Sequence, residues 1–150
     1  MTSSSKAHHL RASAVGAMVT ICLLAGCGAA PSGEDAVVAS REFFDAVAAD
    51  DLVGACELLA PAAREALEEE TGAPCVEALG EGETGLVLRS VAAVAQDTSA
   101  PSVTLAGRQA QVVAGGHVTF LAVSGDSWLI TAAACAPRPD RPYDCELEGD

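Results

Sequence analysis

The hydrophobic pattern of this chain changes its period once, and that change limits the fold more than any other feature. Between residues 32 and 79 apolar residues recur at helical spacing, as Val37, Phe44 and Val47 do. From residue 102 onward they alternate with polar residues between short glycine turns, which is typical of antiparallel strands. Helices followed by a meander of strands predict an α+β fold, with N-terminal helices packed on an antiparallel sheet.

The helical half contains recognisable helix ends. Ser32 and Asp35 have the spacing of a capping box, and Pro61 fits the first turn of a helix. These signals predict helices over about residues 32–49, 52–59 and 61–72 and a short helical turn over 75–79. The glycine and glutamate residues of 80–85 predict a loop, whereas residues 86–95 fit either a helix or a strand.

The second half predicts four strands, over residues 103–106, 109–113, 117–123 and 127–134. Phe120 and Trp128 are expected on neighbouring strands joined by a glycine turn, with both rings facing the helices. Phe43 or Phe44 is expected to contact them, because these rings are the largest apolar groups available to fill a core. The tail from residue 136 is rich in proline and charge and predicts coil.

Residues 1–26 have the features of a secretory signal peptide. Lys6 and Arg11 precede an apolar run from Ala12 to Ala25. This run is shorter than the roughly 20 residues that a membrane-spanning helix needs. No Arg-Arg pair precedes it, which favours the general secretion route over the twin-arginine route.

The apolar run ends in Leu24-Ala25-Gly26-Cys27, which resembles the lipobox of bacterial lipoproteins. The resemblance implies cleavage before Cys27, a diacylglyceryl group on its thiol, acylation such as palmitate, and anchoring to the outer face of the cytoplasmic membrane. The other interpretation is an ordinary signal peptide that contains Cys27 by chance. Residues 27–33 are expected to form a short flexible tether, and residues 34–150 a single domain.

Four cysteines follow Cys27, at positions 56, 75, 135 and 145. An even number of cysteines outside the cytoplasm predicts disulfides. Of the three possible pairings, proximity in sequence favours Cys56 with Cys75 and Cys135 with Cys145, and the second pair would fold the tail back. A metal site is the rival interpretation, but the chain has no Cys-x-x-Cys spacing and only one histidine after Cys27.

The exported part of the chain is strongly acidic. All 21 acidic residues but only six of the eight basic residues follow Cys27, which gives this part a net charge of −15. Such a surface repels phosphate backbones, so we expect no nucleic-acid partner. It also repels anionic headgroups, so attachment to a membrane has to come from the lipid anchor.

No residue pattern points to a catalytic centre or a cofactor. His117 begins a strand beside a glycine turn, where a lone histidine is more often a surface residue than a catalyst. Asp45 and the Asp50-Asp51 pair are expected to cap helix ends, and Glu68-Glu69-Glu70 to form a solvated face. The chain contains no Gly-x-Ser-x-Gly or phosphate-loop motif.

Several short segments carry a family resemblance. They are Phe43-Phe44-Asp45-Ala46-Val47, Asp50-Asp51 and Ala55-Cys56-Glu57-Leu58-Leu59 in the helical half, and Gly107-Arg108-Gln109-Ala110-Gln111-Val112-Val113, Phe120-Leu121, Trp128-Leu129-Ile130 and Cys135 in the strands. Together they resemble NTF2-like domains across residues 35–145, and the whole exported chain resembles small actinobacterial lipoproteins of that type. The resemblance implies a cystatin-like cone, in which helices pack on a strongly curved sheet around a pocket.

The same resemblance leaves two function classes open. Some NTF2-like proteins are isomerases or dehydratases that use an Asp or His in the pocket, but no such residue is assigned here. The expected pocket lining is apolar, with Phe43, Phe44, Phe120, Trp128 and Ile130. That lining favours a non-catalytic binding or accessory module for an envelope protein or a small apolar ligand. The alternative is a small pocket-based isomerase or hydrolase.

Overall fold

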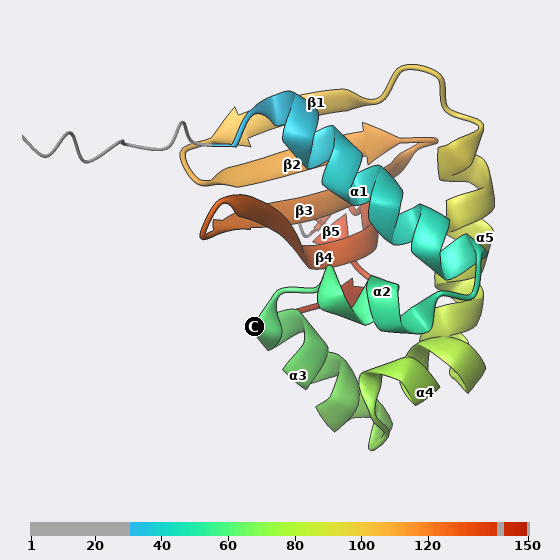
Figure 1. Ribbon diagram of the computed structural model, residues 1–150. Coiled ribbons are helices and arrows are strands. Elements are labelled where there is room, and N and C mark those ends of the chain that lie inside the picture. Colours follow the sequence, from blue (N-terminus) through green and yellow to red (C-terminus); the bar gives the residue numbers. More distant parts are fainter. Residues whose placement is uncertain (1–30, 141–142, 150) are drawn as a thin grey trace, which may run out of the picture.

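Helices precede strands in this protein, and the two layers pack against each other (Figure 1). The computed structural model describes residues 31–140 and 143–149. The expected signal peptide, Cys27 and most of the expected tether lie outside these residues. The helices of the described part are α1 (Gly33–Ala48), α2 (Leu52–Glu57), α3 (Pro61–Thr71), α4 (Cys75–Glu81) and α5 (Glu83–Gln96).

The strands form one curled antiparallel sheet, which confirms the α+β class. They are β1 (Ser102–Ala106), β2 (Gln109–Ala114), β3 (His117–Ser124), β4 (Ser127–Pro137), β5 (Tyr143–Asp144) and β6 (Leu147–Glu148). Their order in the sheet is β1-β2-β3-β4-β5, and β6 also pairs with β4. Among the described elements β1 pairs only with β2, so β1 is an edge of the sheet.

A capping box sets the start of α1, as the sequence predicted. The Asp35 N–H donates to Ser32 Oγ at 3.2 Å, and the Ser32 N–H donates to Asp35 Oδ2 at 2.7 Å. The backbone hydrogen bond from Ser32, followed by the one from its hydroxyl, lowers the pKa of the Asp35 carboxyl. This cap therefore stabilises the fold while Asp35 is ionised, and its contribution is lost as acid protonates the carboxylate.

The expected loop over residues 80–85 is wrong, because α4 and α5 are separated by Gly82 alone. A Cβ on Gly85 would lie 1.8 Å from the Leu79 carbonyl oxygen, so glycine is needed here for a close backbone approach. The Arg89 guanidinium donates to the carbonyl oxygens of Leu79 and Gly80 at 2.9 and 3.0 Å. These bonds satisfy the C-terminal carbonyls of α4 without a loop.

Residues 86–95, which fit two patterns in the sequence, are helical and belong to α5. Their buried members are Leu88, Val91 and Ala92, at helical spacing. Leu86 and Val94 remain exposed on the opposite side of α5. The helical period therefore decides this segment, because one stripe of α5 packs into the core.

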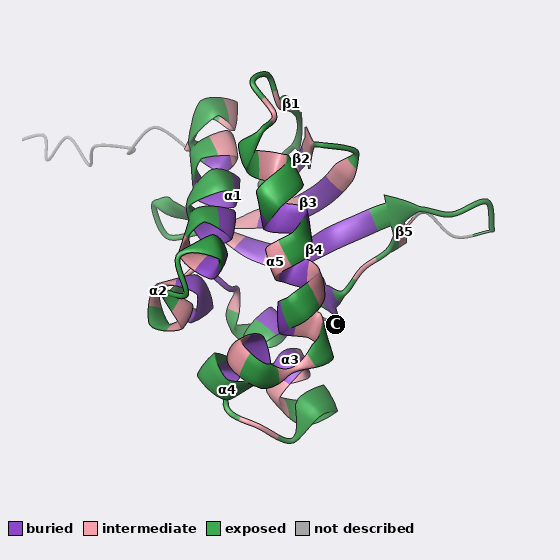
Figure 2. Cartoon of the chain, turned by 90° about the vertical axis from the view of Figure 1, so that its right-hand side faces the viewer, coloured by how far each residue is buried: buried purple, intermediate pink, exposed green. Residues whose placement is uncertain are grey.

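The main core lies between the helices and the inner face of the sheet, where the buried surfaces of both layers meet (Figure 2). Phe43, Phe44 and Trp128 share this core, as expected. Trp128 is 4% exposed, and its Nε1–H donates to the Ser32 carbonyl oxygen at 2.9 Å. The indole therefore joins β4 to the residue that begins α1.

Phe120 does not face the helices, and that expectation is wrong. It belongs to a separate cluster on the outer face of the sheet, where its ring packs edge-on against Tyr143 with centroids 4.9 Å apart. The inner position on β3 is taken by Leu121, which is 1% exposed and pairs with Ile130. Both faces of β3 carry apolar side chains, so alternation alone does not identify the inner one.

The sequence predicted coil from residue 136 onward, and that prediction is wrong. β4 continues to Pro137, and the chain returns to pair β5 and β6 with β4. Leu147 is 3% exposed and joins the main core, while Arg138 and Asp144 form an ion pair across the returning segment. Local composition misses this pairing because it depends on β4, a partner strand outside the tail segment.

Candidate functional site

Side chains fill the space between the helices and the sheet where the resemblance implied a pocket. Of the five expected lining residues, Phe43, Phe44, Trp128 and Ile130 are buried together in the main core. Phe120 lies on the opposite face of the sheet. The expected lining is therefore divided between a packed core and an outer cluster.

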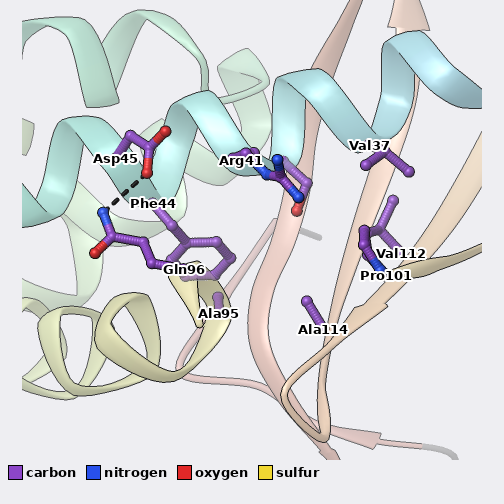
Figure 3. A pocket seen from close by; sticks show the side chains of 10 residues that line it. Val37, Arg41, Phe44, Asp45, Ala95, Gln96, Pro101, Val112 and Ala114 are labelled. Carbon is purple, nitrogen blue, oxygen red and sulfur yellow. Dashed lines mark hydrogen bonds between the residues drawn. The ribbon is translucent and has the colours of Figure 1, made fainter. Parts of the chain in front are cut away.

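A small cavity remains between α1, α5 and β2 (Figure 3). Its volume is about 20 Å³, which is enough for one water molecule. Phe44, Val112 and Ala114 form its apolar wall, and Ser40 is a buried polar side chain on its α1 side. This cavity does not accommodate an organic ligand in the conformation described.

Asp45 lies at the mouth of this cavity and links two helices. Its Oδ1 accepts a hydrogen bond from Gln96 Nε2 at 2.9 Å (Figure 3). Asp45 was expected to cap a helix, but its carboxylate holds α5 beside α1 instead. Asp51 is a cap as expected, because its Oδ1 accepts from the Gly54 N–H at 3.1 Å.

A larger open groove runs along α1 beside β1, next to the small cavity. It has a volume of about 420 Å³ and shares Val37, Arg41, Asp45 and Pro101 with that cavity. We call it the α1–β1 groove; its lining residues are Glu34, Val37, Val38, Arg41, Glu42, Asp45, Pro101 and Val103. Sequence reasoning missed this groove, although residues 98–107 form an uncharged run that ends in an edge strand.

The outer face of the sheet carries a second hollow of about 440 Å³. Phe120, Tyr143 and Glu148 are among its lining residues. The Gln111 Nε2–H donates to the Tyr143 hydroxyl oxygen at 2.7 Å, which holds the returning tail against β2. The tail therefore forms one wall of this hollow.

Two disulfides brace the domain, with the pairings favoured by proximity in the sequence. Cys56 of α2 is joined to Cys75 at the start of α4, with Cα atoms 6.2 Å apart. Cys135 of β4 is joined to Cys145 in the tail. Each bridge lies within one half of the chain, so the first holds helices together and the second holds the tail on the sheet.

The titratable residues singled out in the sequence are scattered. His117 pairs with Ala114 across β2 and β3, and its Nδ1 is buried without a hydrogen-bond partner among the described residues. Glu68 was expected in a solvated run, but its Oε1 accepts from the Cys75 N–H at 3.0 Å. Within residues 31–140 and 143–149, no three His, Cys, Asp or Glu side chains gather as metal ligands.

No family model matches this chain. No curated protein and no solved structure is significantly similar to it. In the part of the chain that the structure describes, no helix has the length and apolar character needed to cross a membrane.

Proposed function

We propose that the protein is an exported lipoprotein, anchored through Cys27 to the outer face of the cytoplasmic membrane. The observation that carries this proposal is the Leu24-Ala25-Gly26-Cys27 motif at the end of a short apolar run. The two disulfides support it, because such bonds persist mainly in oxidising compartments outside the cytoplasm. The α1 cap at Ser32 leaves only a short tether between the lipid and the folded domain.

Replacing Cys27 with serine should abolish lipid attachment, because the hydroxyl does not accept the diacylglyceryl group that the thiol accepts. Mass spectrometry of the native protein should find lipid on an N-terminal Cys27. Membrane fractionation should show that the Cys27→Ser chain is either uncut or released. A Cys22→Ser variant is the matched control, since Cys22 lies inside the signal peptide. A native protein that starts elsewhere and carries no lipid would contradict the proposal.

For the domain itself, we propose an NTF2-like cone that acts as a non-catalytic binding or accessory module of the cell envelope. Helices on a curled antiparallel sheet support the cone. The filled interior, with a cavity of about 20 Å³, supports binding of an envelope protein at the surface over binding of a small ligand inside. The partner would then meet an open surface such as the α1–β1 groove.

A pocket-based isomerase or hydrolase is the alternative, and it is favoured by the buried Nδ1 of His117, which has no hydrogen-bond partner among the described residues. If the protein is a binding module, His117→Ala and Asp126→Ala should each restore the phenotype of a strain that lacks the chain. Complementation at matched protein level in the membrane is the measurement. Loss of complementation with His117→Ala, in a variant that stays folded, would favour the enzyme.

A further inference from the structure

One side of the sheet is covered by added strands, whereas the other side ends in the strand β1, whose outer edge is unpaired among the described residues. On the β4 side, the returning tail adds β5 and β6, and the Cys135–Cys145 disulfide holds it there. On the other side, nothing in the described chain pairs with the outer edge of β1 (Figure 1). Every second residue of an edge strand directs its backbone N–H and C=O away from the sheet, so β1 offers an unfilled hydrogen-bond ladder.

β1 also lacks the features that usually protect an edge strand from pairing. Proteins block such edges with charged side chains, bulges or a covering segment. Residues 98–107 contain no charged side chain, and the register of β1 on β2 is regular from Ser102 to Ala106. Pro101 precedes the strand and leaves its interior open to pairing. Val103 and Leu105 are 38% and 49% exposed, so the edge is apolar as well as unpaired.

The α1–β1 groove lies beside this edge and gives it a second wall. A Cβ on Gly33 would lie 3.3 Å from Val103 Cγ1, so the start of α1 sits directly on β1. Val38, 52% exposed, provides apolar surface along the same helix face. A strand added to β1 would lie about 4.8 Å further out and direct alternate side chains toward these apolar groups.

The charges along the groove select the kind of segment. Its lining includes three carboxylates, on Glu34, Glu42 and Asp45, and one guanidinium, on Arg41. The part of the chain that follows Cys27 has a net charge of −15, from 21 acidic and six basic residues. Basic side chains flanking an apolar strand would therefore meet favourable charges at the groove and across the surrounding surface.

We propose that the free edge of β1 and the α1–β1 groove bind an extended segment of another protein, apolar at alternate positions and basic at its ends. Backbone hydrogen bonds to β1 would supply affinity, and the side chains that enter the groove would supply specificity. This inference rests on the proposed binding function and names its site and the chemistry of its partner.

A second copy of this chain fits the same edge less well. A two-fold interface places identical surfaces opposite each other. It would bring two acidic α1 helices and two domains of the same strong negative charge together. The repulsion between these like charges disfavours pairing of two copies, whereas a basic segment would be attracted to the same surface.

The test uses the lipidated protein in phosphatidylcholine nanodiscs, with empty nanodiscs as the blank. The probe is a labelled synthetic peptide slightly longer than β1, in which valine alternates with threonine and lysines occupy both ends. Fluorescence anisotropy should show binding that weakens as salt is added. The same peptide with glutamates in place of the lysines, and one with a central proline, should bind at least about tenfold more weakly.

Two variants locate the site. Leu105→Lys should weaken binding of the lysine peptide by about tenfold or more, because it places a charge on the open edge. Its matched control is Val53→Lys, at an exposed valine of α2. Glu42→Gln should weaken binding about threefold, and Glu69→Gln, which changes the net charge equally, should have a smaller effect.

Equal binding of the lysine peptide to the parent protein and to Leu105→Lys would overturn the proposed site. Equal binding of the glutamate peptide would overturn the proposed charge preference. A dimer of the detergent-solubilised protein in sedimentation, dissociated by Leu105→Lys and not by Val53→Lys, would assign the edge to a second copy instead. None of these results tests the lipid on Cys27 or the wider binding role. Those proposals are tested separately, by the Cys27→Ser fractionation and by the His117→Ala complementation.

Discussion

Replacing Trp128 with alanine should lower the free energy of unfolding by about 3–5 kcal/mol, as the loss of a large buried aromatic side chain does. Trp128 is 4% exposed and lies in the main core with Phe43. The variant also removes the hydrogen bond to the Ser32 carbonyl oxygen, which ties β4 to the start of α1. Urea denaturation followed by circular dichroism measures the loss.

Two control variants separate packing from hydrogen bonding. Trp128→Phe keeps much of the ring but leaves the Ser32 carbonyl oxygen without the indole donor, so the hydrogen bond should account for about 1 kcal/mol of its loss. Val53→Ala removes apolar atoms from an exposed position and should change stability by less than about 0.5 kcal/mol. A Trp128→Ala loss as small as that of Val53→Ala would show that the indole is not a core residue.

Replacing Cys56 and Cys75 together with alanine should lower the free energy of unfolding by about 3 kcal/mol. The bridge joins residues 19 positions apart. In the loop-entropy model, a bridge that closes a loop of this length lowers the entropy of the unfolded chain and so stabilises the fold by about 3 kcal/mol. The loss is large beside a typical domain stability of about 5–15 kcal/mol. Chemical denaturation under non-reducing conditions provides the measurement.

The Cys135→Ala/Cys145→Ala variant is the natural comparison for that experiment. Its loop spans 10 positions, so the entropic loss should be slightly smaller. Its effect should also be local, because the tail then loses its covalent hold next to Phe120 and Tyr143. Peptide mapping should find Cys56 joined to Cys75 in that variant, and a crossed pairing in the parent protein would contradict both predictions.

Elements with local signals were predicted well from the sequence. The capping pair Ser32 and Asp35 begins α1, Pro61 begins α3, and Gly72 ends it in a left-handed conformation. The four main strands begin and end close to the expected residues, except that β4 is longer than expected. These features depend on a few neighbouring residues, so the sequence pattern is sufficient to identify them.

Features that depend on distant contacts were not predicted. In the sequence, Gly85 is typical of a loop, whereas in the structure it lies in a helix, at a point where the backbone of α4 approaches it too closely for a side chain. β3 carries apolar side chains on both faces, and its pairing with β4 directs Leu121 inward and Phe120 outward. The α1–β1 groove is formed by a helix and a strand that lie about half the domain apart in sequence, so no local pattern describes it.

The bond between Trp128 and Ser32 gives the protein an intrinsic optical reporter. Trp128 is the only tryptophan of the chain, so its emission comes from one place. Indole that is shielded from water emits at shorter wavelength than indole in an unfolded chain. Because its N–H is held by the carbonyl of the residue that caps α1, a shift of the emission to longer wavelength would signal that the end of the tether has separated from the sheet.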